Sequence, residues 1–307
     1  MDRPSFTIGI GHRYDSLYLR NGTVKVEGFD VEYPKPPERE ATQPGVQAAE
    51  RYIAPSTMFT SIATKAVYDV GELPLSTYIQ SVDKGKEVTA IPVFPSRIFP
   101  HNQVAVHSKS GIRRPADLAG KRVGVGFFSK NYAVWLRGVL RHQYDVPVEK
   151  IVWVEDEPEH FPDYRAAKRY AIERAPQRSK SPEVKALFET PYPEIKEYFA
   201  CGIFPINTVI TVPKKTLAKN SDISGAVFEA FRKAFRLYLE EMKQGKREDE
   251  HGGLSLKRLE KEAGITLPEY GFKANRAAIR MMIHLCFEQG IISRLYEPEE
   301  LFLLTNT

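Results

Sequence analysis

Cysteine is nearly absent from this sequence of 307 residues, which contains only Cys201 and Cys286. Two cysteines so far apart, without metal-like spacing, argue against a disulfide framework. No histidines and carboxylates stand at metal-ligand spacing, so we expect no metal. A glycine-rich phosphate loop and a nucleophile elbow are also missing, which disfavours nucleotide chemistry and covalent hydrolysis.

Long apolar runs are absent as well, since none approaches the ~18 residues that a membrane span needs. Residues 1–11 lack a charged stretch followed by an apolar one, so we expect no secretion signal, no membrane association and a cytoplasmic location. The net charge is only +5, from 44 basic and 39 acidic residues. No basic stripe is present, which disfavours nucleic acid and leaves a mild preference for an anionic ligand.

Strand-like and helix-like segments alternate along the chain, which is the pattern of an α/β protein. Apolar residues at helical spacing predict helices over residues 132–144, 224–242 and 279–287, the last ending at Gly290. Proline-rich residues 34–47 are predicted to be an exposed connection. The predicted strands are 6–10, 23–33, 67–73, 89–94, 103–106, 122–125, 151–154 and 208–212.

A short helix beginning near Pro115 feeds directly into the strand 122–125, which suggests the entry to a second lobe. We therefore predict two lobes joined by hinge strands at 103–106 and 208–212. Lobe one comprises residues 1–102 and 212–307, and lobe two comprises residues 103–211, with a ligand cleft between them.

Ligands of open α/β sheets bind beyond the carboxyl ends of the strands, and this rule selects the candidate site. Arg97 is the sharpest candidate, because a planar guanidinium matches a carboxylate in a bidentate way, although a salt bridge to a nearby acid would also explain it. Ser76 and Thr77 start a helix whose N–H groups either hold an anion or are simply capped. The other candidate ligand-binding residues are Arg13, Tyr14, Ser96, Phe128, Ser129, Asn131 and Asn207.

Several segments resemble one known family in order along nearly the whole chain. Residues 111–125 (GIRRPADLAGKRVGV) resemble the lobe-two entry of type II periplasmic-binding proteins and their cytoplasmic relatives. The remaining segments resemble the 4,5-dihydroxyphthalate decarboxylase family. They are IPVFPSR at 91–97 with Phe99 and His101, AVWLRG at 133–138, GIFPI at 202–206, YGFKANR at 270–276, EQG at 288–290 and EELF at 299–302.

The resemblance implies a cofactor-independent decarboxylase of an aromatic acid, with the two-lobed fold of type II periplasmic-binding proteins. His101, and after it His12, then become the candidate proton donors, with Arg97 as the catalytic cation and Arg13 in support. Residues 126–131 and Asn207-Thr208 depart from the family pattern, which leaves open whether the substrate and the activity match.

Two other functions and the assembly state stay open. The same cleft would serve a non-catalytic solute-binding or sensor protein for a small aromatic or heterocyclic acid. A thiamine-pyrimidine type of enzyme shares the fold, but its cysteine-rich iron-binding run is missing here. The expected partner is a small anionic aromatic substrate, and the sequence leaves open whether the chain forms a homo-oligomer.

Overall fold

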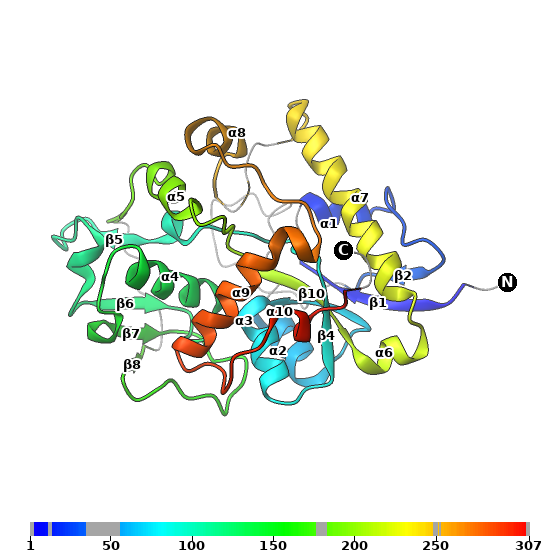
Figure 1. The fold of residues 1–307 in the computed structure, drawn as a ribbon, viewed down its shortest axis with the longest axis horizontal. Helices are drawn as coiled ribbons and strands as arrows, with labels where there is room; N and C mark the ends of the chain where they lie inside the picture. Colours follow the sequence, from blue (N-terminus) through cyan, green and yellow to red (C-terminus); the bar gives the residue numbers. More distant parts are fainter. Residues whose placement is uncertain are drawn as a thin grey trace.

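Five strands form the first sheet of the computed structural model, on the right in Figure 1. The structure describes residues 3–11, 14–34, 56–175, 183–247, 251 and 253–304, so the connection predicted at 34–47 lies outside it except for Pro34. The sheet order is β2-β1-β3-β10-β4. These strands are β1 (Ser5–Gly9), β2 (Asp30–Glu32), β3 (Val70–Pro74), β4 (Val88–Ile91) and β10 (Thr208–Pro213).

Strand direction within this sheet marks where the chain returns. β1 runs parallel to β2 and β3, whereas β10 lies antiparallel between β3 and β4. Every residue of β3 and β10 is buried, as expected of strands covered on both faces. The chain therefore leaves the first sheet after β4 and returns to its centre more than a hundred residues later.

The part of the chain between β4 and β10, on the left in Figure 1, contains two small sheets, and we refer to it as the second lobe after the prediction. Three parallel strands have the order β6-β7-β8, and β5 pairs with β9 antiparallel. Their bounds are β5 (Ala105–His107), β6 (Arg122–Val125), β7 (Val152–Glu155), β8 (Ala171–Arg174) and β9 (Val184–Ala186).

Helices with strong apolar periodicity lie where the sequence predicted them. Gly290 follows the last of them with a φ of +72°, as expected of a left-handed C′ residue, and a 3-10 turn covers Pro115–Leu118. The α-helices are α1 (Tyr14–Arg20), α2 (Ser56–Lys65), α3 (Leu75–Asp83), α4 (Asn131–His142), α5 (Tyr192–Phe199), α6 (Lys214–Lys219), α7 (Ile223–Lys243), α8 (Leu256–Arg258), α9 (Phe272–Glu288) and α10 (Pro298–Leu301).

The strand predicted over residues 23–33 is wrong in extent, because only Asp30–Glu32 pairs with β1. Gly28 has a φ of +84°, which turns the chain before the strand begins. Val24 and Val26 are buried in the core without joining the sheet, so their apolar spacing imitated a strand.

The lobe boundary predicted between 211 and 212 falls inside β10, and the division into lobes stays a prediction.

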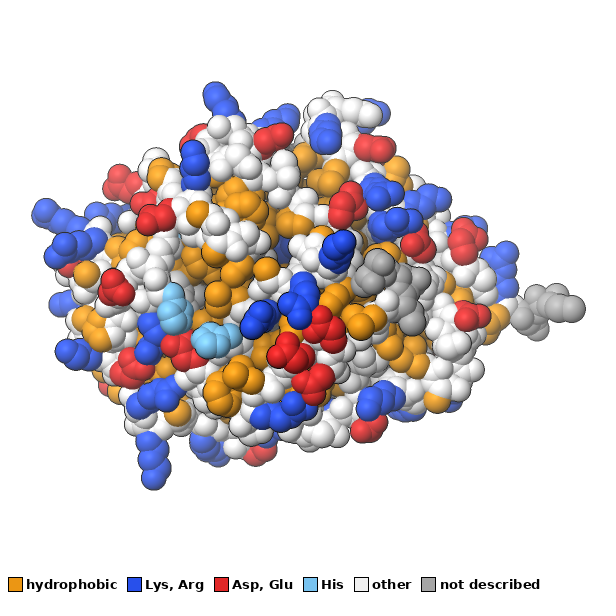
Figure 2. Space-filling model, in the orientation of Figure 1, with side chains coloured by type: hydrophobic (Ala, Val, Ile, Leu, Met, Phe, Trp, Pro, Cys, Tyr) orange, Lys and Arg blue, Asp and Glu red, His pale blue; other side chains and the backbone are white. Residues whose placement is uncertain are grey.

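The surface carries charges of both signs. Figure 2 shows lysine and arginine side chains interspersed with aspartate and glutamate over the face in view. Among the described residues, no helix is both long and apolar enough to cross a membrane.

Helices α4 and α9 pack against each other and join the second lobe to the C-terminal part of the chain. Gly138 of α4 permits this approach, because a Cβ there would lie 2.6 Å from Cδ1 of the buried Leu285. Gly138→Ala should therefore lower the free energy of unfolding by about 1 kcal/mol, since overpacking of ~1–3 kcal/mol outweighs alanine's helix propensity of ~1 kcal/mol.

Denaturant unfolding of the two proteins measures this effect. Gly124→Ala in β6 is the control, because a Cβ at Gly124 meets nothing within 4 Å. A Gly138→Ala protein as stable as the wild type would mean that α4 and α9 tolerate a wider spacing.

Candidate functional site

The start of α3 is bonded to the second lobe. Ser76 and Thr77 lie in its first turn, as predicted, and both are buried. The backbone N–H of Ser76 donates to Oδ1 of Asn131 at 2.8 Å, and Ser76 Oγ donates to the carbonyl of Ser129 at 2.9 Å. Thr77 Oγ1 lies 2.8 Å from Nδ1 of His160. Side chains of one lobe thus meet the backbone and side chains of the other at this helix terminus.

Asn131 lies at the centre of these contacts. Its Nδ2 donates to the carbonyl of Ile206 at 2.9 Å and to Oδ1 of Asn207 at 3.3 Å. Asn207 in turn donates from Nδ2 to Ser96 Oγ at 3.2 Å. Six residues predicted separately from different loops therefore form one set of contacts, together with His160, which was not predicted as a site residue. We call it the bridging network; its members are Ser76, Thr77, Ser96, Ser129, Asn131, His160 and Asn207.

The N–H groups just before α4 are bonded to the chain's own carboxylates. Glu155 accepts from the backbone N–H of Phe128 at 2.7 Å. Glu159 accepts from the backbone N–H of Ser129 at 3.0 Å and from the Ser129 hydroxyl. Anions are favoured at such a terminus, and here protein side chains supply them.

Glu159 is the most strongly perturbed acid near the bridging network. Glu159 is 7% exposed, and burial raises the pKa of its carboxyl to about 7. The hydrogen bonds from Ser129 lower this pKa, but burial has the larger effect. A carboxyl that titrates near neutral pH can give or take a proton under ordinary conditions. Glu159 was not predicted from the sequence, although its place just past the carboxyl end of β7 was an available signal.

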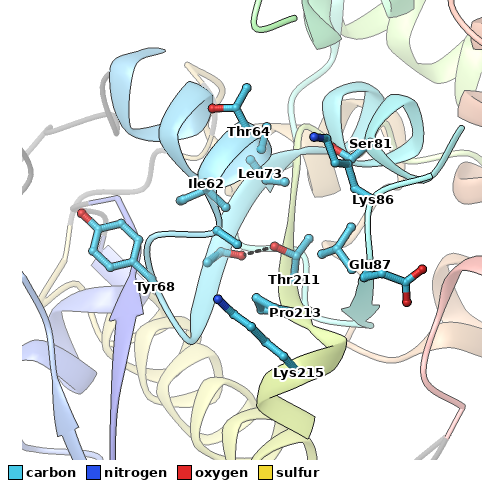
Figure 3. A pocket seen from close by; sticks show the side chains of 14 residues that line it. Ile62, Thr64, Tyr68, Leu73, Ser81, Lys86, Glu87, Thr211, Pro213 and Lys215 are labelled. Carbon is cyan, nitrogen blue, oxygen red and sulfur yellow. Dashed lines mark hydrogen bonds between the residues drawn. The ribbon is translucent and has the colours of Figure 1, made fainter. Parts of the chain in front are cut away.

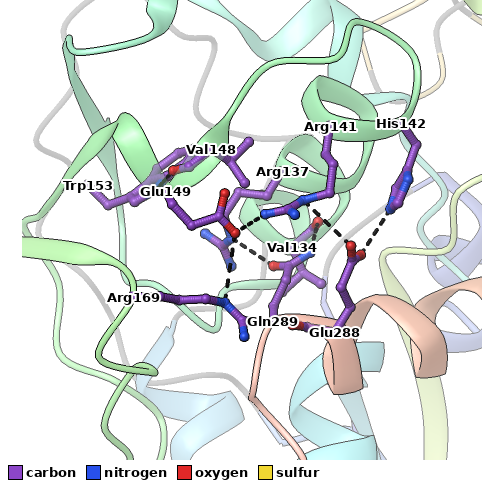
Figure 4. Close-up of polar contacts among 10 residues, drawn as sticks. All are labelled: Val134, Arg137, Arg141, His142, Val148, Glu149, Trp153, Arg169, Glu288 and Gln289. Atoms are coloured by element: carbon purple, nitrogen blue, oxygen red, sulfur yellow. Dashed lines mark hydrogen bonds and ion pairs between the residues drawn. The ribbon is translucent and has the colours of Figure 1, made fainter.

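Arg137 of α4 is buried close to Glu159, at 1% exposure. Its Nε donates to Oε1 of Gln289 at 2.7 Å, and its Nη2 donates to the carbonyl of Phe128 at 2.6 Å. The guanidinium carbon lies 3.7 Å from the ring centroid of Phe128 and 5.2 Å from that of Trp153. Figure 4 shows Arg137 beside Gln289, which also donates to the carbonyl of Val134.

A second set of ions surrounds Arg137 on the outside of α4. Glu288 forms an ion pair with Arg141 at 3.5 Å, and its carboxylate lies 2.9 Å from Nε2 of His142 (Figure 4). Glu149 pairs with Arg141 as well and lies 3.8 Å from Arg169. The contacts of Glu288 link α4 to the end of α9, whereas those of Glu149 lie within the second lobe.

Arg97 points away from the bridging network towards the C-terminal part of the chain. It is 1% exposed, its Nη1 donates to the carbonyl of Pro268, and its guanidinium lies 5.0 Å from the ring of Phe235 and 5.2 Å from that of Tyr270. Its backbone pairs with Ile206, whose carbonyl accepts from Asn131. The side chain therefore contacts the lobe-one core, and its role in ligand binding stays a prediction.

His101 lies in an aromatic enclosure. Its Nε2 is 2.8 Å from Oε1 of Gln143, and the ring centroids of Phe188 and Tyr198 are both 5.6 Å from its own. Burial lowers the pKa of His101 to about 4, so the ring is neutral at pH 7. A neutral imidazole is a weak proton donor, and the assignment of His101 as the catalytic acid stays a prediction that this environment does not favour.

Four further predicted residues have less structural support. His12 and Arg13 lie outside the described residues, and Tyr14 begins α1 without a described side chain. Phe128 is fully buried and its ring stacks on Arg137, so it contacts the interior of the second lobe.

A cavity of about 210 Å³ lies elsewhere, at the edge of the first sheet opposite to the carboxyl ends of β3 and β4. Figure 3 shows its walls, to which Ile62 and Leu73 contribute apolar side chains and Lys86 and Lys215 contribute charged ones. None of the predicted site residues lines it.

No family model matches the sequence. The fold is that of the periplasmic-binding proteins, as predicted. The alkanesulfonate-binding protein SsuA from Xanthomonas axonopodis pv. citri is similar with a TM-score of 0.54 at 14% identity, covering 99% of both chains. The sulfonate-binding protein SsuA from Methylobacillus flagellatus KT has a TM-score of 0.58 at 9% identity, covering 99% of this chain and 92% of that one.

In sequence, the chain is 28% identical to the 4,5-dihydroxyphthalate decarboxylase of Comamonas testosteroni, over 98% of this chain and 97% of that one. It is also 28% identical to the 4,5-dihydroxyphthalate decarboxylase of Pseudomonas putida, over 50% of this chain and 54% of that enzyme. The resemblance to 4,5-dihydroxyphthalate decarboxylases inferred from the motifs is thereby confirmed.

Proposed function

We propose that this protein is a cofactor-independent decarboxylase of a hydroxylated aromatic dicarboxylic acid such as 4,5-dihydroxyphthalate. The observation that carries the proposal is the similarity to the Comamonas testosteroni decarboxylase, which extends over nearly the full length of both chains. The fold supports a small anionic ligand, since the sulfonate-binding proteins that share it are named for small anions.

The reaction requires a proton at one ring carbon and a place for the carboxylate. Protonation of the carbon that carries the carboxylate draws electrons from the hydroxyl group para to it. The bond from this carbon to the carboxylate then breaks, its electron pair returns to the ring, and CO₂ leaves. The product is 3,4-dihydroxybenzoate, and the consumed proton comes from an acid on the protein.

Glu159 is the proton donor that the geometry favours. It lies against Ser129 of the bridging network, where the two lobes meet, and its carboxyl keeps a proton for part of the time at pH 7. His101 and His12 are the donors that the sequence analysis favours. Arg97 and Arg13 remain candidates for holding a carboxylate.

The test of the proposed function is CO₂ release from purified protein given 4,5-dihydroxyphthalate, without added metal or cofactor. We expect CO₂ and 3,4-dihydroxybenzoate in equal amounts. Tight binding of dihydroxylated aromatic diacids with no CO₂ from any of them would favour the second candidate, a non-catalytic solute-binding protein. That candidate is supported by the binding proteins that share the fold.

A further inference from the structure

The backbone N–H groups at both helix starts of the bridging network are already engaged by protein oxygens. Asn131 accepts from Ser76, while Glu155 and Glu159 accept from Phe128 and Ser129. A substrate carboxylate would have to displace these oxygens to use the same N–H groups. Buried donors elsewhere near the site are therefore better placed to receive it.

Arg137 carries such donors. Among the described residues, its Nη1 has no hydrogen-bond partner and no carboxylate lies within ion-pair distance of its guanidinium. Burying a cation without a counter-ion costs several kcal/mol by order of magnitude, so such an arrangement is unusual in a purely structural core. Glu159 is close enough to lower the cost by electrostatic attraction, but it does not pair with Arg137 directly.

Two tyrosines add hydroxyl donors at the same place. Tyr164 and Tyr170 are both close enough to Arg137 to raise its pKa. The ring centroid of Tyr170 lies 4.8 Å from that of Phe128, which in turn stacks on Arg137. Both hydroxyls are buried without a hydrogen-bond partner among the described residues.

Proteins rarely leave several neighbouring buried donors unsatisfied. Here one guanidinium nitrogen and two hydroxyl groups, all donors, gather next to an acid that titrates near neutral pH. An acceptor with two or more oxygens and a negative charge, such as a carboxylate, matches this set in charge and number.

We propose that Arg137, Tyr164 and Tyr170 form a buried subsite that binds a carboxylate of the aromatic acid. The subsite deepens the proposed function and depends on it for the class of ligand. Glu159 lies beside the subsite, so a carboxylate held there would place the ring within the neighbourhood of the proposed proton donor.

Both tyrosines of the subsite lie on the segment between β7 and β8. Residues 156–170 contain Glu159, both tyrosines and no regular helix or strand. It contacts lobe one where His160 meets Thr77.

The experiment measures binding of phthalate by calorimetry, because phthalate has both carboxylates but no hydroxyl group to drive decarboxylation. Tyr164→Phe and Tyr170→Phe should each weaken phthalate binding about tenfold or more, the scale for a lost hydrogen bond to a charged group. Neither change should lower thermal stability, since each removes a hydroxyl that has no partner in the protein. Arg137→Met should abolish binding, although it also breaks the contacts to Gln289 and Phe128.

Tyr144→Phe is the matched control, because the Tyr144 hydroxyl is likewise buried without a partner among the described residues but lies beside His101. It should leave phthalate affinity unchanged. Unchanged affinity in both Tyr164→Phe and Tyr170→Phe, or no phthalate binding by the wild type, would overturn the subsite. Binding that depends on both tyrosines without CO₂ release from 4,5-dihydroxyphthalate would support the subsite and overturn the proposed function.

Discussion

Replacing Glu159 by glutamine is expected to lower the turnover of 4,5-dihydroxyphthalate about 10²–10⁴-fold, the usual contribution of general acid catalysis. Glutamine keeps the size of the side chain and one oxygen to accept from the Ser129 N–H, so the fold should be retained. Steady-state kinetics on both proteins measure the effect. Glu157→Gln is the control, because Glu157 forms an ion pair with Lys130 near the same loop, and it should retain nearly full rate.

The pH profile gives this prediction a second readout. Burial raises the pKa of Glu159 to about 7, and the groups that face it are Arg137 of α4, Glu155 at the end of β7 and the Ser129 hydroxyl. Because the protonated acid is the active form, kcat should fall as pH rises above about 7. A Glu159→Gln protein with full rate and an unchanged alkaline limb would show that the proton comes from another group, with His101 and then His12 next to be tested.

Acidification between pH 6.5 and pH 4 is expected to destabilise the fold through two buried histidines. Burial lowers the pKa of both His101 and His160 to about 4, so the unfolded chain binds protons in this range that the folded protein does not. The folded protein is therefore not penalised by these two histidines above pH 6.5, and its free energy of unfolding decreases as the pH falls from 6.5 towards 4. Each histidine contributes up to about 3 kcal/mol, at 1.36 kcal/mol per pKa unit.

Denaturant unfolding at pH 7.5 and pH 4.5 measures this loss. The phenylalanine of His101→Phe fills the same aromatic enclosure without a titrating group. Over that interval, the free energy of unfolding of this variant should therefore fall by about 2 kcal/mol less than that of the wild type. Glu159 acts in the opposite direction, since a raised carboxyl pKa favours the folded state at low pH, and comparing the two proteins cancels its effect. Equal losses in both proteins would mean that His101 is hydrated and titrates normally.

The sequence allowed the periodic parts of the fold to be predicted. Strand 122–125 and the helices around Trp135, Phe231 and Met282 lie where apolar spacing placed them, since each pattern reports burial of a single element. The segment 23–33 failed because a turn at Gly28 and tertiary burial of Val24 and Val26 are not visible in spacing alone.

The candidate site was predicted only in part, for a similar reason. The rule of strand ends selected Ser76, Ser129 and Asn131, and the departure from the family pattern selected Asn207. The structure joins these residues in the bridging network. Glu159 and Arg137 owe their properties to burial by distant segments; Arg137, for example, contacts Gln289 across more than a hundred residues of sequence. Nothing in the local sequence of an arginine or a glutamate indicates such an environment.

The most direct test of decarboxylation is to run the reaction in deuterated water and examine the product by proton NMR. The proposed chemistry places a solvent-derived proton on the ring carbon that loses CO₂. The 3,4-dihydroxybenzoate formed should therefore carry one deuterium, at the ring position next to the remaining carboxylate and para to a hydroxyl group. Recovery of unchanged 4,5-dihydroxyphthalate after prolonged incubation with folded protein that binds it would contradict the proposed activity.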